Sequence, residues 1–71
     1  MIYKLEGYDN MQMDKEDYLK KALLDTQERV RDYMNYSKQV DDPQLQSCFR
    51  EFAETEGRHA QVLQGFISEL S

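Results

Sequence analysis

Three consecutive residues, Asp41-Asp42-Pro43, divide the chain into two stretches of helical periodicity and constrain its fold more than any other feature. Proline disfavours helical geometry at the residue before it, so a helix that reaches Val40 has to end there. Pro43 in turn suits the first position of a new helix, with the Asp42 carboxylate capping its free N–H groups. So short a connection forces the two helices to lie antiparallel. The sequence therefore predicts an all-α structure, an antiparallel two-helix hairpin.

Each of the two stretches carries an apolar stripe at helical spacing. The first helix is predicted over about residues 15–40, with Asp14 as its N-cap and a stripe centred on Thr26. The second helix is predicted over about residues 43–70, and Glu56 lies in the middle of its stripe. The remaining members of the stripes are Leu19, Ala22, Leu23, Val30, Tyr33, Ser37 and Val40 in the first, and Leu45, Phe49, Phe52, Leu63, Phe66, Ile67 and Leu70 in the second.

Two helices alone cannot cover both stripes, because each stripe spans more than about 100° of its helix. A chain of 71 residues is also short for an independent domain, and oligomerisation is a common remedy at this size. We therefore expect a homodimer, or a higher homo-oligomer, in which two hairpins close a four-helix bundle. Residues 1–14 show no period and are expected to form an N-terminal tail or arm, which leaves residues 15–71 as the hairpin domain.

Composition and charge argue against several kinds of partner. The formal net charge is −5 and the basic residues are scattered, which speaks against nucleic acid and against an anionic membrane surface. No run approaches the roughly 18 apolar residues of a membrane span. Cys48 is the single cysteine, so an internal disulfide and a cysteine-based zinc site are excluded, and a reduced, cytoplasmic setting fits best.

Glu56 and His59 form the candidate functional site. Their spacing of three residues places a carboxylate and an imidazole one above the other on a helix, within an otherwise apolar stripe. A buried carboxylate normally neutralises, finds a partner or binds a metal. In carboxylate-bridged di-iron bundles Glu-x-x-His supplies one oxygen and one nitrogen ligand, and a symmetric dimer would offer four ligands. Asp25 is the nearest further carboxylate on the first helix, about 100° from the centre of its stripe.

A metal-free interpretation of the same residues stays open. Arg29 lies about 60° from the centre of the first stripe and can pair with Glu56. His59 can bond to Glu56 or to Tyr33. A buried ion pair of this kind sets the register of packed helices without adding stability.

From about residue 24 to residue 70 the sequence resembles the ferritin-like superfamily, closest to the encapsulated ferritins and more loosely to the rubrerythrins. The resemblance rests on Tyr33, the Asp42-Pro43 turn, Leu45 and the run Glu56-x-x-His59-Ala60. It implies a half-bundle chain that dimerises, assembles an iron site across the interface and oxidises ferrous iron. Glu56 and His59 fall on the two metal ligands of the family's second helix, and Tyr33 falls on a tyrosine beside the site.

Thr26 departs from that pattern, because it stands where the family carries the glutamate of its first helix. The resemblance therefore implies an incomplete ligand set, to which Asp25 is the nearest possible addition. Two functions follow as alternatives: a homodimer that binds iron or another divalent metal, with a ferroxidase-like activity, or a metal-free ferritin-like structural or adaptor protein.

Overall fold

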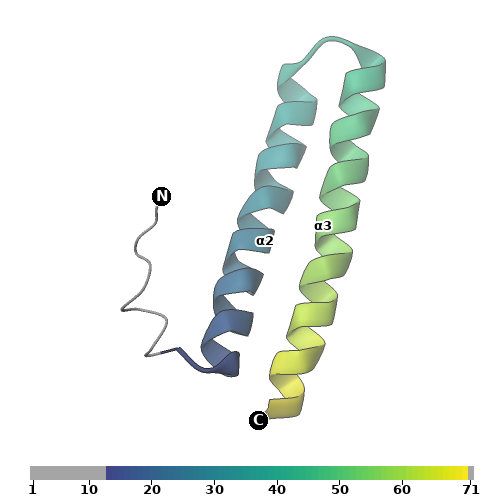
Figure 1. Ribbon diagram of the computed structural model, residues 1–71. Coiled ribbons are helices and arrows are strands. Elements are labelled where there is room, and N and C mark those ends of the chain that lie inside the picture. Colours follow the sequence, from purple (N-terminus) through teal and green to yellow (C-terminus); the bar gives the residue numbers. More distant parts are fainter. Residues whose placement is uncertain (1–12, 71) are drawn as a thin grey trace.

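The computed structural model describes residues 13–70, which form two antiparallel helices, as Figure 1 shows. Helix α2 spans Lys15–Gln39 and helix α3 spans Pro43–Leu70. The predicted all-α hairpin is confirmed, and the helix bounds agree with the prediction to within one residue. The arm predicted over residues 1–14 lies outside the described residues up to residue 12.

The first helix begins at Asp14 through a reciprocal pair of side-chain hydrogen bonds. The Asp17 N–H donates to Asp14 Oδ1 at 3.1 Å, and the Asp14 N–H donates to Asp17 Oδ2 at 3.3 Å. Two N–H groups that the first turn would leave unpaired are satisfied in this way. Asp14 is therefore the N-cap that the sequence predicts.

The turn is closed by side chains on both of its sides. The Gln44 N–H donates to Asp42 Oδ1 at 2.9 Å, which caps the start of α3. Gln46 Nε2 donates to the carbonyl oxygen of Val40 at 2.7 Å, so a side chain of α3 satisfies the last residue before the turn. Val40 itself has left helical geometry, with φ −94° and ψ 151°. These bonds fix how the two helices leave the turn.

Aromatic rings fill the half of the hairpin next to the turn. The Tyr33 ring stacks on Phe49 with centroids 6.2 Å apart and meets Phe52 edge to face at 5.4 Å. Tyr36 contacts Phe49 at 5.5 Å. Such geometries add modestly to the area that the rings bury.

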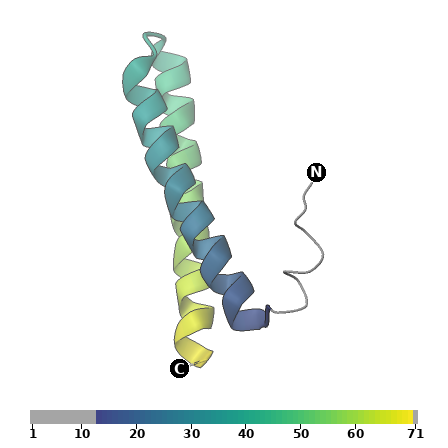
Figure 2. The ribbon, with the colours of Figure 1, turned by 90° about the vertical axis from the view of Figure 1, so that its left-hand side faces the viewer.

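The two helices approach closely along a line of small side chains. Thr26, Ser37 and Ala53 are the buried residues of the described chain, and none of them is large. In the view of Figure 2 the helices overlap near the turn and separate toward the chain ends. Neither helix, over residues 13–70, is long and apolar enough to cross a membrane.

Candidate functional site

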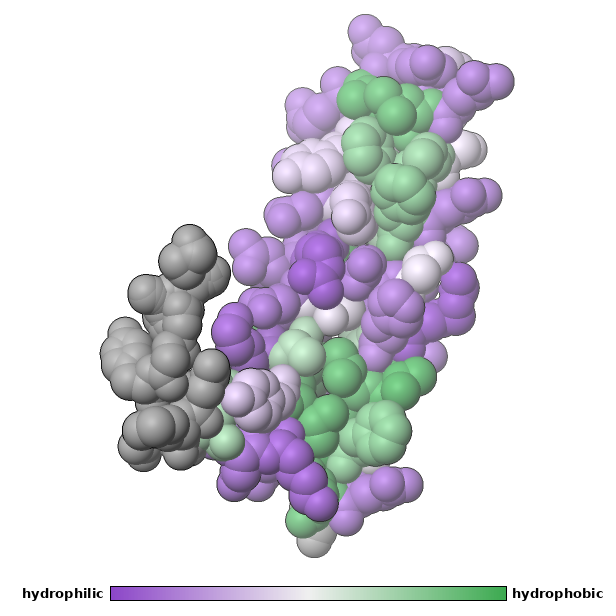
Figure 3. All heavy atoms as spheres, in the orientation of Figure 1, coloured by the Kyte–Doolittle hydropathy of each residue, from purple (hydrophilic) through white to green (hydrophobic). Residues whose placement is uncertain are grey.

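One face of the hairpin exposes large apolar side chains. Phe52 is 46% and Phe66 is 54% exposed, and Leu45 and Leu70 lie on the same side of α3. Tyr18 and Tyr36 extend this face onto α2. Figure 3 shows two apolar clusters on this side of the molecule, separated by a polar band at mid-height. The surface that two helices cannot cover by themselves is therefore interrupted at its centre.

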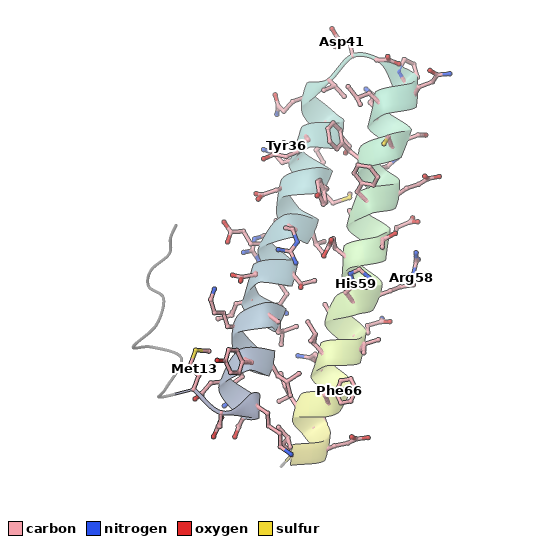
Figure 4. The ribbon with its side chains drawn as sticks, in the orientation of Figure 1. Met13, Tyr36, Asp41, Arg58, His59 and Phe66 are labelled. Atoms are coloured by element: carbon pink, nitrogen blue, oxygen red, sulfur yellow. The ribbon has the colours of Figure 1, made fainter. Side chains whose placement is uncertain are left out.

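Three polar side chains meet at mid-height of the hairpin, where Figure 4 labels His59: Glu56 and His59 from α3 and Arg29 from α2. We refer to this group as the polar band. Arg29 Nε lies 3.3 Å from Glu56 Oε1, and His59 Nδ1 lies 3.6 Å from the same oxygen. Glu56 stands at the middle of α3, with 13 helical residues before it and 14 after it. One carboxylate oxygen thus meets a guanidinium and an imidazole halfway along the hairpin.

These three side chains differ in how much of them is exposed. Glu56 is only 18% exposed, whereas Arg29 is 48% and His59 is 61% exposed. Glu56 Oε1 itself is buried and accepts no hydrogen bond from the described residues. Its polar contacts are the ion pairs with Arg29 and His59. Glu56 is thus largely enclosed, as the sequence predicts, and it meets Arg29, the contact that the metal-free interpretation allows.

His59 is more open than its place in the apolar stripe indicates. It lies about 60° from Glu56 around α3, on the side turned away from the buried Ala53. Figure 4 shows His59 at mid-height of the hairpin and Arg58 pointing away from α2. The His59 imidazole therefore lies on the uncovered face beside the Glu56 carboxylate.

Thr26 takes part in the same group, which sequence reasoning did not find. Arg29 Nη2 donates to Thr26 Oγ1 at 3.2 Å, while Thr26 is only 3% exposed. The spacing of three residues between Thr26 and Arg29 was the signal that could have revealed this contact. The Arg29 guanidinium is thus held by Thr26 through Nη2 and by Glu56 through Nε.

Asp25 is not brought to this site. Its Oδ2 accepts a hydrogen bond from Lys21 Nζ at 3.0 Å, an ion pair one turn apart on α2 whose two side chains are about half exposed or more. No group of three or more His, Cys, Asp or Glu side chains converges within residues 13–70. The additional ligand that Asp25 could have provided is therefore missing from a single hairpin.

Tyr33 lies beside the site through a shared cavity. A hollow of about 300 Å³ is lined by Tyr33, Phe52, Thr55 and Glu56. It joins the aromatic cluster near the turn to the polar band. Tyr33 and Glu56 thus line the same hollow.

Two copies of the Glu56 and His59 pair would suit one divalent ion better than two. Two ligands of a tetrahedral ion, each about 2.1 Å from it, lie about 3.4 Å apart. The 3.6 Å between Glu56 Oε1 and His59 Nδ1 is close to that separation. Two copies would give two oxygen and two nitrogen ligands, which complete one tetrahedral site. A second ion would need further carboxylates, and Thr26 has none.

A family model described as Rubrerythrin matches residues 17–71, which include all but the first two residues of α2, the turn and all of α3. Neither the curated proteins nor the solved structures gave a significant match.

Proposed function

The chain belongs to the rubrerythrin family, and we propose from this that it forms a homodimeric four-helix bundle that binds a divalent metal ion, iron first, through Glu56 and His59 of both copies. The observation that carries the proposal is the pair formed by a buried carboxylate oxygen and an imidazole nitrogen 3.6 Å apart. The two groups lie on the face of the hairpin that also exposes Phe52 and Phe66.

The position of Glu56 explains why two copies would share one site. A two-fold axis brings a residue close to its own copy only where the axis passes. Glu56 lies at the middle of α3 and within the polar band, so an axis through this band also pairs the apolar clusters above and below it. The arrangement would enclose Phe52 and Phe66, which are about half exposed in one hairpin.

The residues would have separate roles toward the ion. Glu56 would hold it through a carboxylate oxygen and His59 through an imidazole nitrogen, and the two carboxylates would balance its charge. Bound iron supplies electron transfer to oxygen in sites with the full ligand set that the family resemblance implies. In the proposed site Thr26 supplies no carboxylate, so the ligand set is smaller. We therefore propose metal binding as the primary function and ferrous-iron oxidation only as a secondary one.

Metal analysis of the untagged protein tests the proposal. After anaerobic dialysis against Fe²⁺, or dialysis against Co²⁺, wild type should retain about one ion per dimer. Glu56→Gln and His59→Gln should each lose it, because each removes two of four ligands. Glu69→Gln, an exposed change near the end of α3, is the matched control and should bind as wild type. Retention of metal by both site variants would contradict the proposal.

The Arg29–Glu56 pair favours a second candidate function. With a guanidinium 3.3 Å from its carboxylate, the polar band needs no metal to balance the charge of Glu56. The protein would then be a metal-free ferritin-like scaffold or adaptor whose central ion pair sets the register of the bundle. In that case added Fe²⁺ or Co²⁺ would leave the melting temperature of wild type unchanged, whereas a ligand of the folded state raises it.

A further inference from the structure

We infer that Arg29 competes with the metal ion for Glu56: its guanidinium holds the carboxylate while no ion is bound and has to leave for the carboxylate to become a ligand. This inference rests on the proposed metal binding. It assigns to a residue outside the ligand set the control of how tightly the ion is held.

The competition follows from a single oxygen atom. Arg29 Nε and His59 Nδ1 both approach Glu56 Oε1, at 3.3 Å and 3.6 Å. An ion ligated by this oxygen and by His59 would lie about 2.1 Å from each. Its charge would then stand next to the guanidinium, and like charges at such distances in a partly enclosed site repel strongly. Ion and guanidinium therefore compete for this oxygen.

Arg29 is the partner that can move. The Glu56 side chain is largely enclosed at the middle of α3, with 18% of it exposed. The Arg29 side chain is 48% exposed and so has more room to move. A long arginine stem can remain packed on the helix while the charged group turns into water. The hydrogen bond from Arg29 Nη2 to Thr26 Oγ1, 3.2 Å long, is the contact that favours the inward position. Thr26 thus offers no carboxylate ligand to the ion, and its hydroxyl group keeps the competing Arg29 guanidinium near Glu56.

Cobalt titration of the full-length, untagged chain tests the inference, because bound Co²⁺ reports its ligands by absorption without any catalysed reaction. Arg29→Met should bind Co²⁺ up to about fivefold more tightly than wild type, the factor that corresponds to losing a half-exposed competing ion pair. The spectrum should be that of wild type, because the ligands are unchanged.

Arg58→Met is the matched control for loss of positive charge. Arg58 is exposed, points away from α2 and donates to Thr55 Oγ1 at 3.1 Å. Its loss should change the affinity less than twofold. An equal gain in both variants would overturn the inference, because it would reflect net charge alone.

A second variant keeps the test sharp if Arg29→Met does not fold, which circular dichroism would reveal. Thr26→Val keeps the shape of the side chain but removes the Oγ1 acceptor, and should tighten Co²⁺ binding about threefold, the factor that corresponds to losing one modest hydrogen bond. If the folded variants bind Co²⁺ no more tightly than wild type, the inference is overturned. The proposed function would still stand in that case, provided that wild type binds Co²⁺. No Co²⁺ binding by any of the proteins would overturn both. Binding by Arg29→Met but not by wild type would support the competition and contradict metal binding as the native function.

Discussion

Arg29 and Glu56 join the two helices at the middle of the hairpin, with Nε of the arginine 3.3 Å from Oε1 of the glutamate. Within residues 13–70 this is the one ion pair that connects α2 to α3, since the other pairs lie within a single helix. A slip of one helical turn, about 5.4 Å, would separate the two groups. The pair therefore marks a single register of the hairpin.

Removing the two partners of this pair should have unequal effects on stability. Arg29→Met leaves the Glu56 carboxylate enclosed without its guanidinium partner, so we expect a loss of about 1–3 kcal/mol in the free energy of unfolding of the metal-free protein. Glu56→Leu leaves an arginine that can reach water, and should be neutral or stabilising. Urea unfolding in the presence of a chelator measures the free energy of unfolding of both variants. Arg58→Met changes an exposed residue and is the control, whose free energy of unfolding should lie within about 0.5 kcal/mol of wild type. Equal, small losses for both partners would show that the Glu56 carboxylate is well hydrated.

The uncovered apolar face should hold the dimer together. Phe52→Asp places a charge in the apolar cluster near the turn, so light scattering after size exclusion should change from about twice the 8.5 kDa chain mass toward a single chain. Leu24→Asp is the control, because Leu24 is 66% exposed but lies about 160° from Thr26 on the outer side of α2. Dissociation by the outer change but not by Phe52→Asp would place the interface elsewhere.

Restoring the missing carboxylate should change the metal stoichiometry. Thr26→Glu adds one carboxylate per copy where Arg29 now finds its holder, so the dimer would have six ligands in place of four. We expect Fe²⁺ or Co²⁺ content to rise from about one to about two ions per dimer, as element analysis would measure. Thr26→Gln has a similar size without the charge and should stay at one ion. If Thr26→Glu and Thr26→Gln both bind one ion per dimer, the side chain at position 26 does not reach the metal site.

The turn should depend on the Asp42 side chain. Asp42→Ala removes the acceptor for the Gln44 N–H and should lower the free energy of unfolding by about 1 kcal/mol. Asp41→Ala, a change of an exposed residue at the same turn, is the comparison and should cost less. Thermal or urea unfolding of the two variants gives the difference, and equal losses would mean that the turn depends on its total charge instead of the cap.

The helices and their ends were predictable because their causes are local. Asp14 and Asp42 bond to N–H groups within three residues, and Pro43 acts on the residue before it. The enclosure of Glu56 was also predictable, since the helical period alone places it between apolar neighbours. Such causes act within a few residues and leave a clear pattern in the sequence.

The details of the site were less predictable because they depend on how one helix is turned against the other. Periodicity assigned His59 to the apolar stripe but did not indicate which side of the stripe faces α2, and the imidazole lies on the open side. The bond from Arg29 to Thr26 likewise depends on which of several rotamers the arginine adopts. Asp25 was a candidate by position only, and nearby Lys21 is its partner.

The brevity of the link between the helices also bears on the order in which the hairpin assembles. Closing a short loop costs little chain entropy, so the rings of Tyr33 and Phe49 can meet early, while the ends of α2 and α3 far from the turn come together last. Amide hydrogen exchange should accordingly be slowest in the aromatic half and fastest toward Leu70. If the helices pack progressively from the turn toward their far ends, Arg29 and Glu56 meet midway. By then the aromatic rings have already fixed which residues of α2 lie opposite which residues of α3.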